Sequence, residues 1–193
     1  ALERASDALR AEIVVRPFQL NPHVAQGGED VVEHLSRKYG ISAEQIAQNQ
    51  ASIHARGAAL GFTFGQRDRI FNTFDAHRLL HWAGLQDAQQ QVALKQALLQ
   101  TYHGRGEDVG QHEVLVRAAE AAGLDGTAAR AVLTSGAYAD EVREREAFYQ
   151  RAGVTSVPAV ILNDRYLISG GQPPEVFEQA LRQVLAEEAA AAS

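Results

Sequence analysis

The chain of 193 residues contains neither cysteine nor methionine. The lack of cysteine excludes a disulfide, a thiolate-bound zinc ion and a cysteine nucleophile within these residues. The lack of methionine, together with alanine at position 1, leads us to expect processing or truncation at the N-terminus. No secretory feature is visible in the sequence, so we expect a cytoplasmic protein.

Long apolar runs and basic clusters are also missing. The apolar stretches span only a few residues, which is too short to cross a bilayer. The formal net charge is -6, and acidic and basic residues alternate without a Lys/Arg block that could follow a phosphate backbone. We therefore expect neither a membrane nor a nucleic acid as partner. The hydrophobic share of 46% is typical of a globular domain with a substantial core.

Helical patterns fill the middle of the chain. Helices are predicted over Glu29–Tyr39, Ser42–Leu60, Thr73–Ala83, Asp87–Tyr102, Gln111–Ala122, Thr127–Leu133 and Ala137–Ala152. Gly40, directly after the first of these, is typical of a helix C-terminus. The second begins with Ser42 and has Gln45 three residues later, which is the spacing of a capping box.

Strands are predicted only towards the two ends of the chain. They cover Glu12–Leu20, Val157–Leu162 and Tyr166–Ser169, with Pro17 favouring an edge position or the end of the first strand. Asn163-Asp164 is typical of a two-residue hairpin turn between the last two strands. A helix end is predicted over Ala1–Leu9, and a final helix runs from Pro174 to about Glu188. A lone strand so far from a hairpin needs a common sheet to join.

This order of elements resembles the thioredoxin fold of the DsbA family, and short segments resemble its FrnE-like branch. The matching segments are Arg16–Pro22, Asn72–His81, Val154–Pro158 and Ile168–Pro174, in the expected order. The resemblance implies an α/β protein with a thioredoxin fold and a large all-helical insertion between the second and third strands. It implies a thioredoxin-like domain at 1–28 and 153–193, without its first strand, and an inserted helical domain at 29–152.

The same resemblance implies a thiol–disulfide oxidoreductase or isomerase that acts through a mixed disulfide. In this family the first strand and a Cys-x-x-Cys precede the residues that align with Ala1, so we expect roughly 20–30 residues to be missing there. The catalytic cysteines would then lie outside the 193 residues, and the chain alone would be inactive. The implied partner is a cysteine-containing protein or a small thiol. No cofactor is expected apart from glutathione as an optional thiol co-substrate, and the chain is expected to be a monomer or homodimer.

The resemblance also assigns substrate-binding residues, while it leaves no catalytic residue in the chain. The substrate-binding residues are Val157, Pro158, Asn72, His77, Arg78 and Gln172. Pro158 is expected to follow a cis peptide bond, with the main chain of Val157 free to pair with a peptide. Asn72 is expected to cap the following helix and, with the residues up to Arg78, to border the groove. Gln172 is expected either near the reactive centre or in a plain helix entry.

Other histidines and the tryptophan have simpler interpretations. His77 and His81 are four residues apart, a spacing that suits two metal ligands, but no third ligand is evident and we expect no metal. Trp82 is expected in the core. His103 and His112 lie near predicted helix ends, where a surface cap is the favoured role.

Two other functions are open at this point. Glutathione-dependent isomerases and transferases of the kappa type share the implied fold, with a serine in place of the first cysteine. Alternatively, the chain is a redox-inactive thioredoxin-fold domain that binds peptides, which the absence of cysteine favours if the chain is complete.

Overall fold

A computed structural model describes residues 11–191 of the chain. It divides into two compact units: a terminal unit, Ala1–Val14 with Glu146–Ser193, and a helical unit, Val15–Arg145. The domain boundaries expected from the sequence stay a prediction, and the helix end predicted over Ala1–Leu9 lies outside the described residues.

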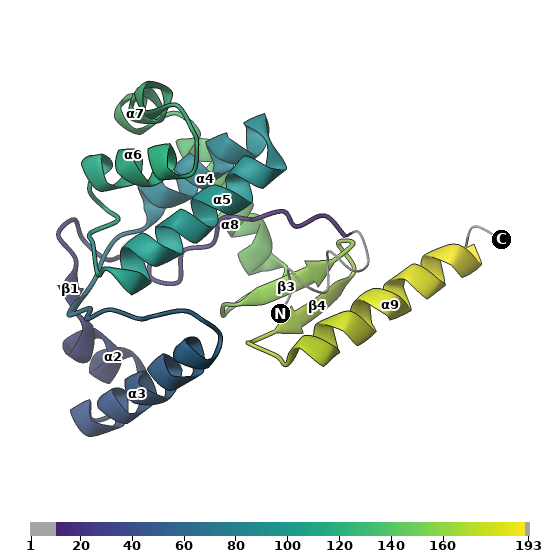
Figure 1. The fold of residues 1–193 in the computed structure, drawn as a ribbon, viewed down its shortest axis with the longest axis horizontal. Helices are drawn as coiled ribbons and strands as arrows, with labels where there is room; N and C mark the ends of the chain where they lie inside the picture. The colour runs from purple at the N-terminus through teal and green to yellow at the C-terminus, as the bar shows by residue number, and fades with distance from the viewer. Residues whose placement is uncertain (1–10, 192–193) are drawn as a thin grey trace. The chain divides into compact units, whose positions relative to one another are not determined.

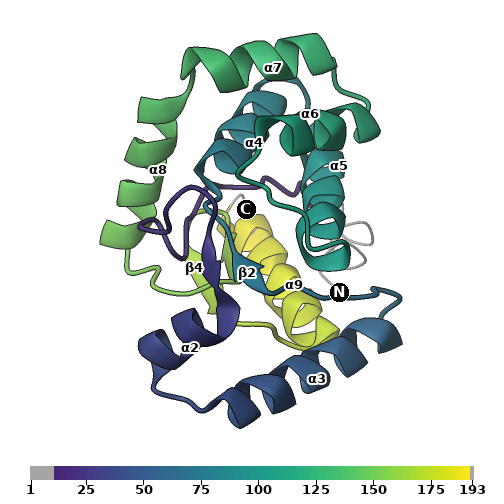
Figure 2. The same ribbon diagram turned by 90° about the vertical axis from the view of Figure 1, so that its left-hand side faces the viewer.

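The helical unit carries most of the secondary structure (Figures 1 and 2). Its elements are β1 (Glu29–Asp30), α2 (Val31–Tyr39), α3 (Ala43–Ala59), β2 (Arg69–Ile70), α4 (Phe74–Gln86), α5 (Ala88–Leu99), the π-helix η1 (Gln100–Gly104), α6 (His112–Ala121), α7 (Gly126–Ser135) and the first part of α8 (Ala139–Arg151). Strands β1 and β2 pair antiparallel, with Glu29 opposite Ile70. Each predicted helix is present, whereas the two short strands and the π-helix were not predicted. No helix among the described residues is long and apolar enough to cross a membrane.

Local capping signals set the ends of α2 and the start of α3. Gly40 follows α2 in the left-handed conformation, with φ of 67°, and its N–H donates to Ser36 O. The Ser42 hydroxyl accepts from Gln45 N at 3.2 Å, and the Gln45 side chain accepts from Ser42 N at 2.9 Å. Both predicted boundaries are confirmed because each depends only on neighbouring residues.

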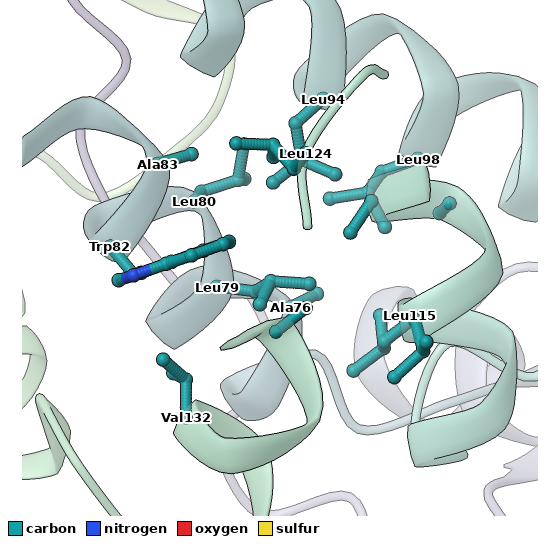
Figure 3. Packing of buried hydrophobic residues seen from close by; sticks show 14 of the residues in the cluster. Ala76, Leu79, Leu80, Trp82, Ala83, Leu94, Leu98, Leu115, Leu124 and Val132 are labelled. Carbon is teal, nitrogen blue, oxygen red and sulfur yellow. The ribbon is translucent and has the colours of Figure 1, made fainter. Parts of the chain in front are cut away.

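The core of the helical unit lies between α4, α5, α6 and α7 (Figure 3). Its most deeply buried side chains, all with no exposed surface, are Leu79, Ala83, Leu94, Leu115, Ala119 and Ala129. Trp82 is also buried in this cluster, as predicted. The apolar faces of these helices thus stabilise the bundle by removing their side chains from water.

The terminal unit is a β-hairpin packed on a helix. Strands β3 (Ala159–Leu162) and β4 (Tyr166–Ser169) pair antiparallel, and α9 runs over Pro174–Ala191 (Figure 1). One face of the hairpin packs with α9 around Leu162 and Phe177. Between the strands, Asn163 and Asp164 both have positive φ, 47° and 55°, as a type I′ turn requires. A turn at Asn163-Asp164 is therefore confirmed, but its predicted length of two residues is wrong, because Leu162 lies opposite Tyr166 and Arg165 is also in the loop.

The predicted strand over Glu12–Leu20 is wrong, because residues 11–20 contain no strand or helix. A side chain pairs with this segment in place of a neighbouring strand. Gln91, only 4% exposed, accepts from Val15 N at 3.0 Å and donates to Val15 O at 3.1 Å. The same amide nitrogen donates to Leu80 O at 3.1 Å. A β-branched run forms a strand only when a second strand satisfies its main chain, and here an amide does so.

Replacing Gln91 should therefore loosen this segment. In Gln91→Leu, a side chain of similar size leaves the N–H and C=O of Val15 unpaired and removes the side-chain donor to Leu80 O, so we expect about 1–3 kcal/mol lower stability to urea. Amide hydrogen exchange at Val15 should also become faster. The control is Gln89→Leu on the same helix, where the side chain is exposed and only the main-chain N–H is bonded. Equal exchange rates at Val15 in both variants would contradict this role.

Candidate functional site

In the terminal unit, the predicted substrate-binding residues gather around the start of β3. The Val157–Pro158 peptide bond is cis. Pro158 O accepts from Gly170 N at 2.8 Å, and Gly170 has a φ of 79°, which glycine adopts without strain. The side chain of Gln172 donates to Ser169 O at 2.9 Å. The bond from Gly170 joins the loop before β3 to the loop after β4, and the bond from Gln172 holds the second loop to the end of β4.

The main chain of Val157 is open. Within residues 11–191, neither its N–H nor its C=O makes a hydrogen bond. Its side chain is 46% exposed. Because the carbonyl of Pro158 accepts from Gly170, the open position lies one residue earlier, just before the paired start of β3. An unpaired main-chain donor and acceptor at such a position is what an extended peptide needs in order to bind by strand addition.

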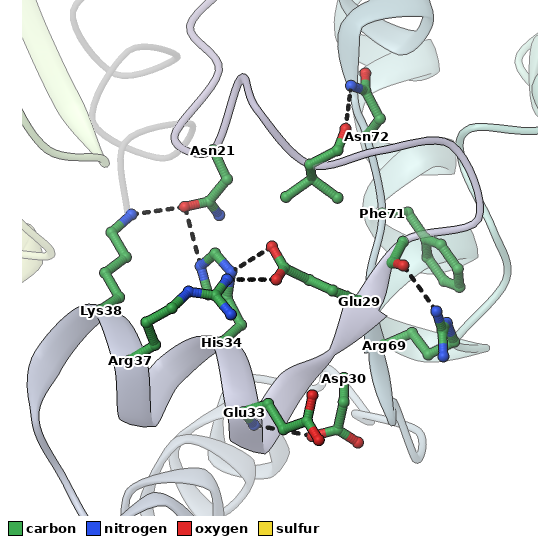
Figure 4. Close-up of polar contacts among 12 residues, drawn as sticks. Asn21, Glu29, Asp30, Glu33, His34, Arg37, Lys38, Arg69, Phe71 and Asn72 are labelled. Carbon is green, nitrogen blue, oxygen red and sulfur yellow. Dashed lines mark hydrogen bonds and ion pairs between the residues drawn. The ribbon is translucent and has the colours of Figure 1, made fainter.

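In the helical unit, Asn72 joins two segments (Figure 4). Its amide nitrogen donates to Val24 O at 2.7 Å. Its side-chain oxygen accepts from Phe74 N at 2.9 Å, in the first turn of α4. The N-cap residue of α4 is Thr73, so Asn72 lies one residue before the predicted capping position. Its side chain still bonds the first N–H of the helix and holds the loop around residue 24 beside the start of α4.

Arg78 is 3% exposed, and the protein itself uses its guanidinium group. It donates to Ala137 O at 2.8 Å, to Leu133 O at 3.3 Å and to Val132 O, and it forms an ion pair with Asp75 at 2.7 Å. The carbonyls of residues 132 and 133 belong to the last turn of α7, where no intrahelical partner is available. This arrangement favours a structural role for Arg78 over the predicted contact with substrate.

Removing Arg78 should destabilise the helical unit strongly. Arg78→Met leaves several carbonyl groups and Asp75 without their buried partner, so we expect a loss of about 3–5 kcal/mol in the free energy of unfolding. The control is Arg130→Met on α7, whose ion pair with Glu113 is exposed and should contribute little to stability. Chemical denaturation followed by circular dichroism measures both. Similar small losses would show that the carbonyl contacts of Arg78 stabilise little.

His77 is a half-buried imidazole whose Nδ1 is inaccessible to water. Burial, and then the nearby charge of Lys95, lower the pKa of His77 to about 3, against a smaller opposing effect of a hydrogen bond to the Phe18 main chain. Its Nδ1 has no hydrogen-bond partner among the described residues. Burial likewise lowers the pKa of Lys95. A neutral, enclosed imidazole gives no charge to a substrate, so its predicted binding role would rest on shape and on one polar atom.

The remaining histidines differ from the predicted surface caps. His103 lies on η1 between aromatic rings, with centroid distances of 4.8 Å to Tyr102 and 6.1 Å to Phe64. Burial, and then Arg67 and Lys95, lower the pKa of His103 to about 4. His112 contacts Asp75 at 3.0 Å. His103 is half-buried against these aromatic rings and is not the surface cap that was predicted. Among residues 11–191, no group of three His, Asp or Glu side chains could hold a metal ion.

The low pKa of His77 predicts acid sensitivity. Because the pKa falls from 6.5 in the unfolded chain to about 3 in the fold, the unfolded state binds the proton more readily, and stability declines as pH falls. Between about pH 7 and about pH 5, His77 should remove about 2 kcal/mol of stability. His77→Gln should remove this part of the slope, whereas His23→Gln, at an exposed position, should leave it unchanged. Urea unfolding at several pH values checks this, and parallel slopes for the wild type and His77→Gln would refute it.

The hairpin packed on α9 and the long helical unit together define a DsbA-like thioredoxin fold, which is the predicted fold class. The model of the DSBA-like thioredoxin domain matches residues 1–182, so the chain belongs to this family. Membership in its FrnE-like branch stays a prediction.

Solved structures agree with this fold. The chain is similar to the crystal structure of a probable DsbA oxidoreductase, SCO1869 from Streptomyces coelicolor, with 39% identity and a TM-score of 0.84. That match covers 95% of this chain and 82% of the other. A putative protein disulfide isomerase from Nitrosomonas europaea has 19% identity and a TM-score of 0.62, over 82% of this chain and 89% of the other. The second match supports the fold alone.

A curated relative is similar over a shorter stretch. The uncharacterized protein YwbO of Bacillus subtilis (strain 168) is 31% identical over 85 residues. The match covers 44% of this chain and 42% of YwbO, less than half the length of either protein.

Proposed function

We propose that this chain is the larger part of a thiol–disulfide oxidoreductase of the DsbA type, in the FrnE-like branch. The observation that carries the proposal is the family match over residues 1–182. The similar Streptomyces structure, described as a probable DsbA oxidoreductase, supports it. The proposed substrate is a cysteine-containing protein or a small thiol in the cytoplasm, with no cofactor beyond glutathione as a thiol co-substrate.

The proposed reaction needs two cysteines from outside the 193 residues, because none is present within them. In the oxidising direction, a substrate thiolate attacks the enzyme disulfide and forms a mixed disulfide, while one enzyme cysteine leaves as thiolate. A second substrate thiolate then attacks the mixed disulfide. The substrate leaves with a disulfide, and both enzyme cysteines are reduced by the same two electrons.

Val157 supplies the peptide-binding part of the proposal. Its unpaired N–H and C=O would pair with the main chain of an extended substrate, beside Pro158. Gln172 would hold the neighbouring loop through its bond to Ser169. In the helical unit, Asn72 would fix the start of α4, and Arg78 is given no direct contact with substrate.

One observation favours a second function. The 193 residues hold an open peptide-pairing position but no cysteine. A thioredoxin-fold domain that binds extended peptides without redox chemistry would need the first feature and not the second. The two functions differ in whether the natural protein carries a redox-active cysteine pair.

Intact mass, before and after reduction and alkylation, separates these functions. For the protein purified from its natural source, we expect a mass above 20.9 kDa and two alkylations that appear only after reduction. A mass of 20.9 kDa without alkylation would reject redox catalysis by this polypeptide and favour peptide binding.

A variant at Val157 tests the binding step in the cysteine-containing protein. Val157→Pro removes the N–H that we assign to the substrate, so kcat/KM for a reduced protein substrate should fall about tenfold or more. Exchange with a small thiol, which needs no main-chain pairing, should change less. Thr155→Pro places the same residue in the same exposed loop as a control. Equal losses for the protein substrate in both variants would reject the pairing role.

A further inference from the structure

A pocket of about 500 Å³ lies within the helical unit. Its lining comes from two stretches, Leu20–Ala25 and Gly28–Lys38, and includes His34, Arg37 and Lys38 from α2. These three are spaced i, i+3 and i+4, which places them on one face of the helix. The volume is in the range of small-molecule sites.

The acceptors in this pocket are already engaged (Figure 4). Glu29 accepts from Arg37 through one oxygen and meets His34 Nδ1 at 2.7 Å through the other. Asn21 Oδ1 accepts from Lys38 Nζ at 2.6 Å and lies 3.2 Å from His34 Nε2. Hydrogen bonds from Arg37 and then His34 also keep the pKa of Glu29 below its usual value, so this carboxylate stays ionised and neutralises part of the cationic group.

The unused hydrogen-bonding groups on the side chains of Asn21, Arg37 and Lys38 are donors. An ammonium group only donates, so the short contact from Lys38 identifies the Asn21 atom as oxygen and turns the amide Nδ2 to the other side. Among the described residues, Asn21 Nδ2 and the Nε and NH1 groups of Arg37 have no hydrogen-bond partner. Lys38 uses two acceptors, Asn21 Oδ1 and Leu20 O, and retains a third N–H.

We propose that this pocket binds a small anion through a carboxylate or phosphate group held by Asn21, Arg37 and Lys38. An anion supplies the acceptors that these donors lack, and charge-assisted bonds from Arg and Lys are the strong ones. Glu29 offsets only one of the two permanent positive charges. His34 is buried, with 6% of its surface exposed, and its contacts hold Asn21 and Glu29 in position next to Arg37 and Lys38. The pocket lies entirely within the helical unit, so the inference does not depend on the redox function.

Asn21→Asp is the discriminating variant. Its carboxylate keeps an acceptor for Lys38 and His34, so the loop should stay in place. The substitution removes both N–H donors and adds a negative charge beside the bound group. We expect the dissociation constant for an anion to rise at least about tenfold, the size expected for a lost charge-assisted bond with added repulsion. Arg37→Gln should weaken binding in the same direction.

Titrations of the full chain, followed by amide chemical shifts in NMR, test this at constant ionic strength. The probes are inorganic phosphate, N-acetylglycine as a carboxylate, and neutral N-acetylglycinamide. We expect saturable shifts over residues 20–38 with at least one anion and none with the neutral amide. A preference for phosphate would indicate a phosphoester ligand, and a preference for N-acetylglycine would indicate a carboxylic acid or peptide C-terminus.

The control variant is Arg56→Gln, which removes an exposed positive charge on α3 outside the pocket lining. It should leave the anion affinity within about twofold, as expected for a distant screened charge. Non-saturable shifts with both anions would overturn the proposal. So would an unchanged affinity in Asn21→Asp, or an equal loss in Arg56→Gln.

Discussion

The burial of α4 against α5 and α7 is the interaction on which the rest of the helical unit depends. Leu79 and Ala83 have no exposed surface and hold α4 in the core. Polar groups on this fixed helix then form hydrogen bonds with other segments. Arg78 caps the end of α7 from it, and Leu80 O accepts from Gln91, which also holds Val15. These buried polar groups tolerate burial only because each finds a partner, and the helix supplies that partner at a fixed place.

Local signals predicted local structure well. The capping box at Ser42, the glycine after α2 and the turn at Asn163-Asp164 each depend on residues within a few positions, and all are present. The segment around Val15 failed because strand formation depends on a partner elsewhere in the chain. Nothing near Val15 in the sequence indicates that Gln91, 76 positions away, takes the place of a strand. The π-helix was not predicted for a related reason. The ring of His103 in η1 contacts Phe64, which precedes α4 and is distant in the sequence.

The site shows the same division. The resemblance predicts Val157 and Pro158 as substrate-binding residues; within residues 11–191, the carbonyl of residue 158 is hydrogen-bonded and the main chain of residue 157 is not. The sequence alone could not decide whether Arg78 borders the groove or caps α7 from a buried position, because either role requires an arginine on one face of the helix. The cationic face of α2 did leave a signal, since His34, Arg37 and Lys38 are spaced i, i+3 and i+4. What sequence did not show is that Asn21 and Glu29 meet that face.

Whether a basic side chain of the helical unit is charged depends on its access to water and on a neighbouring carboxylate. His77 and His103 are enclosed, and burial lowers their pKa values to about 3 and about 4, so both are neutral near pH 7. Arg37 is exposed and has Glu29 as its counter-ion. Some N–H donors of its charged guanidinium group are not used by this ion pair. An anion approaching a protein of net charge -6 needs a local excess of accessible cations rather than buried imidazoles. In this unit the pocket lined by Arg37 and Lys38 of α2 supplies that excess. We therefore expect this pocket to bind the anion, and His77 and His103 to contribute chiefly to stability.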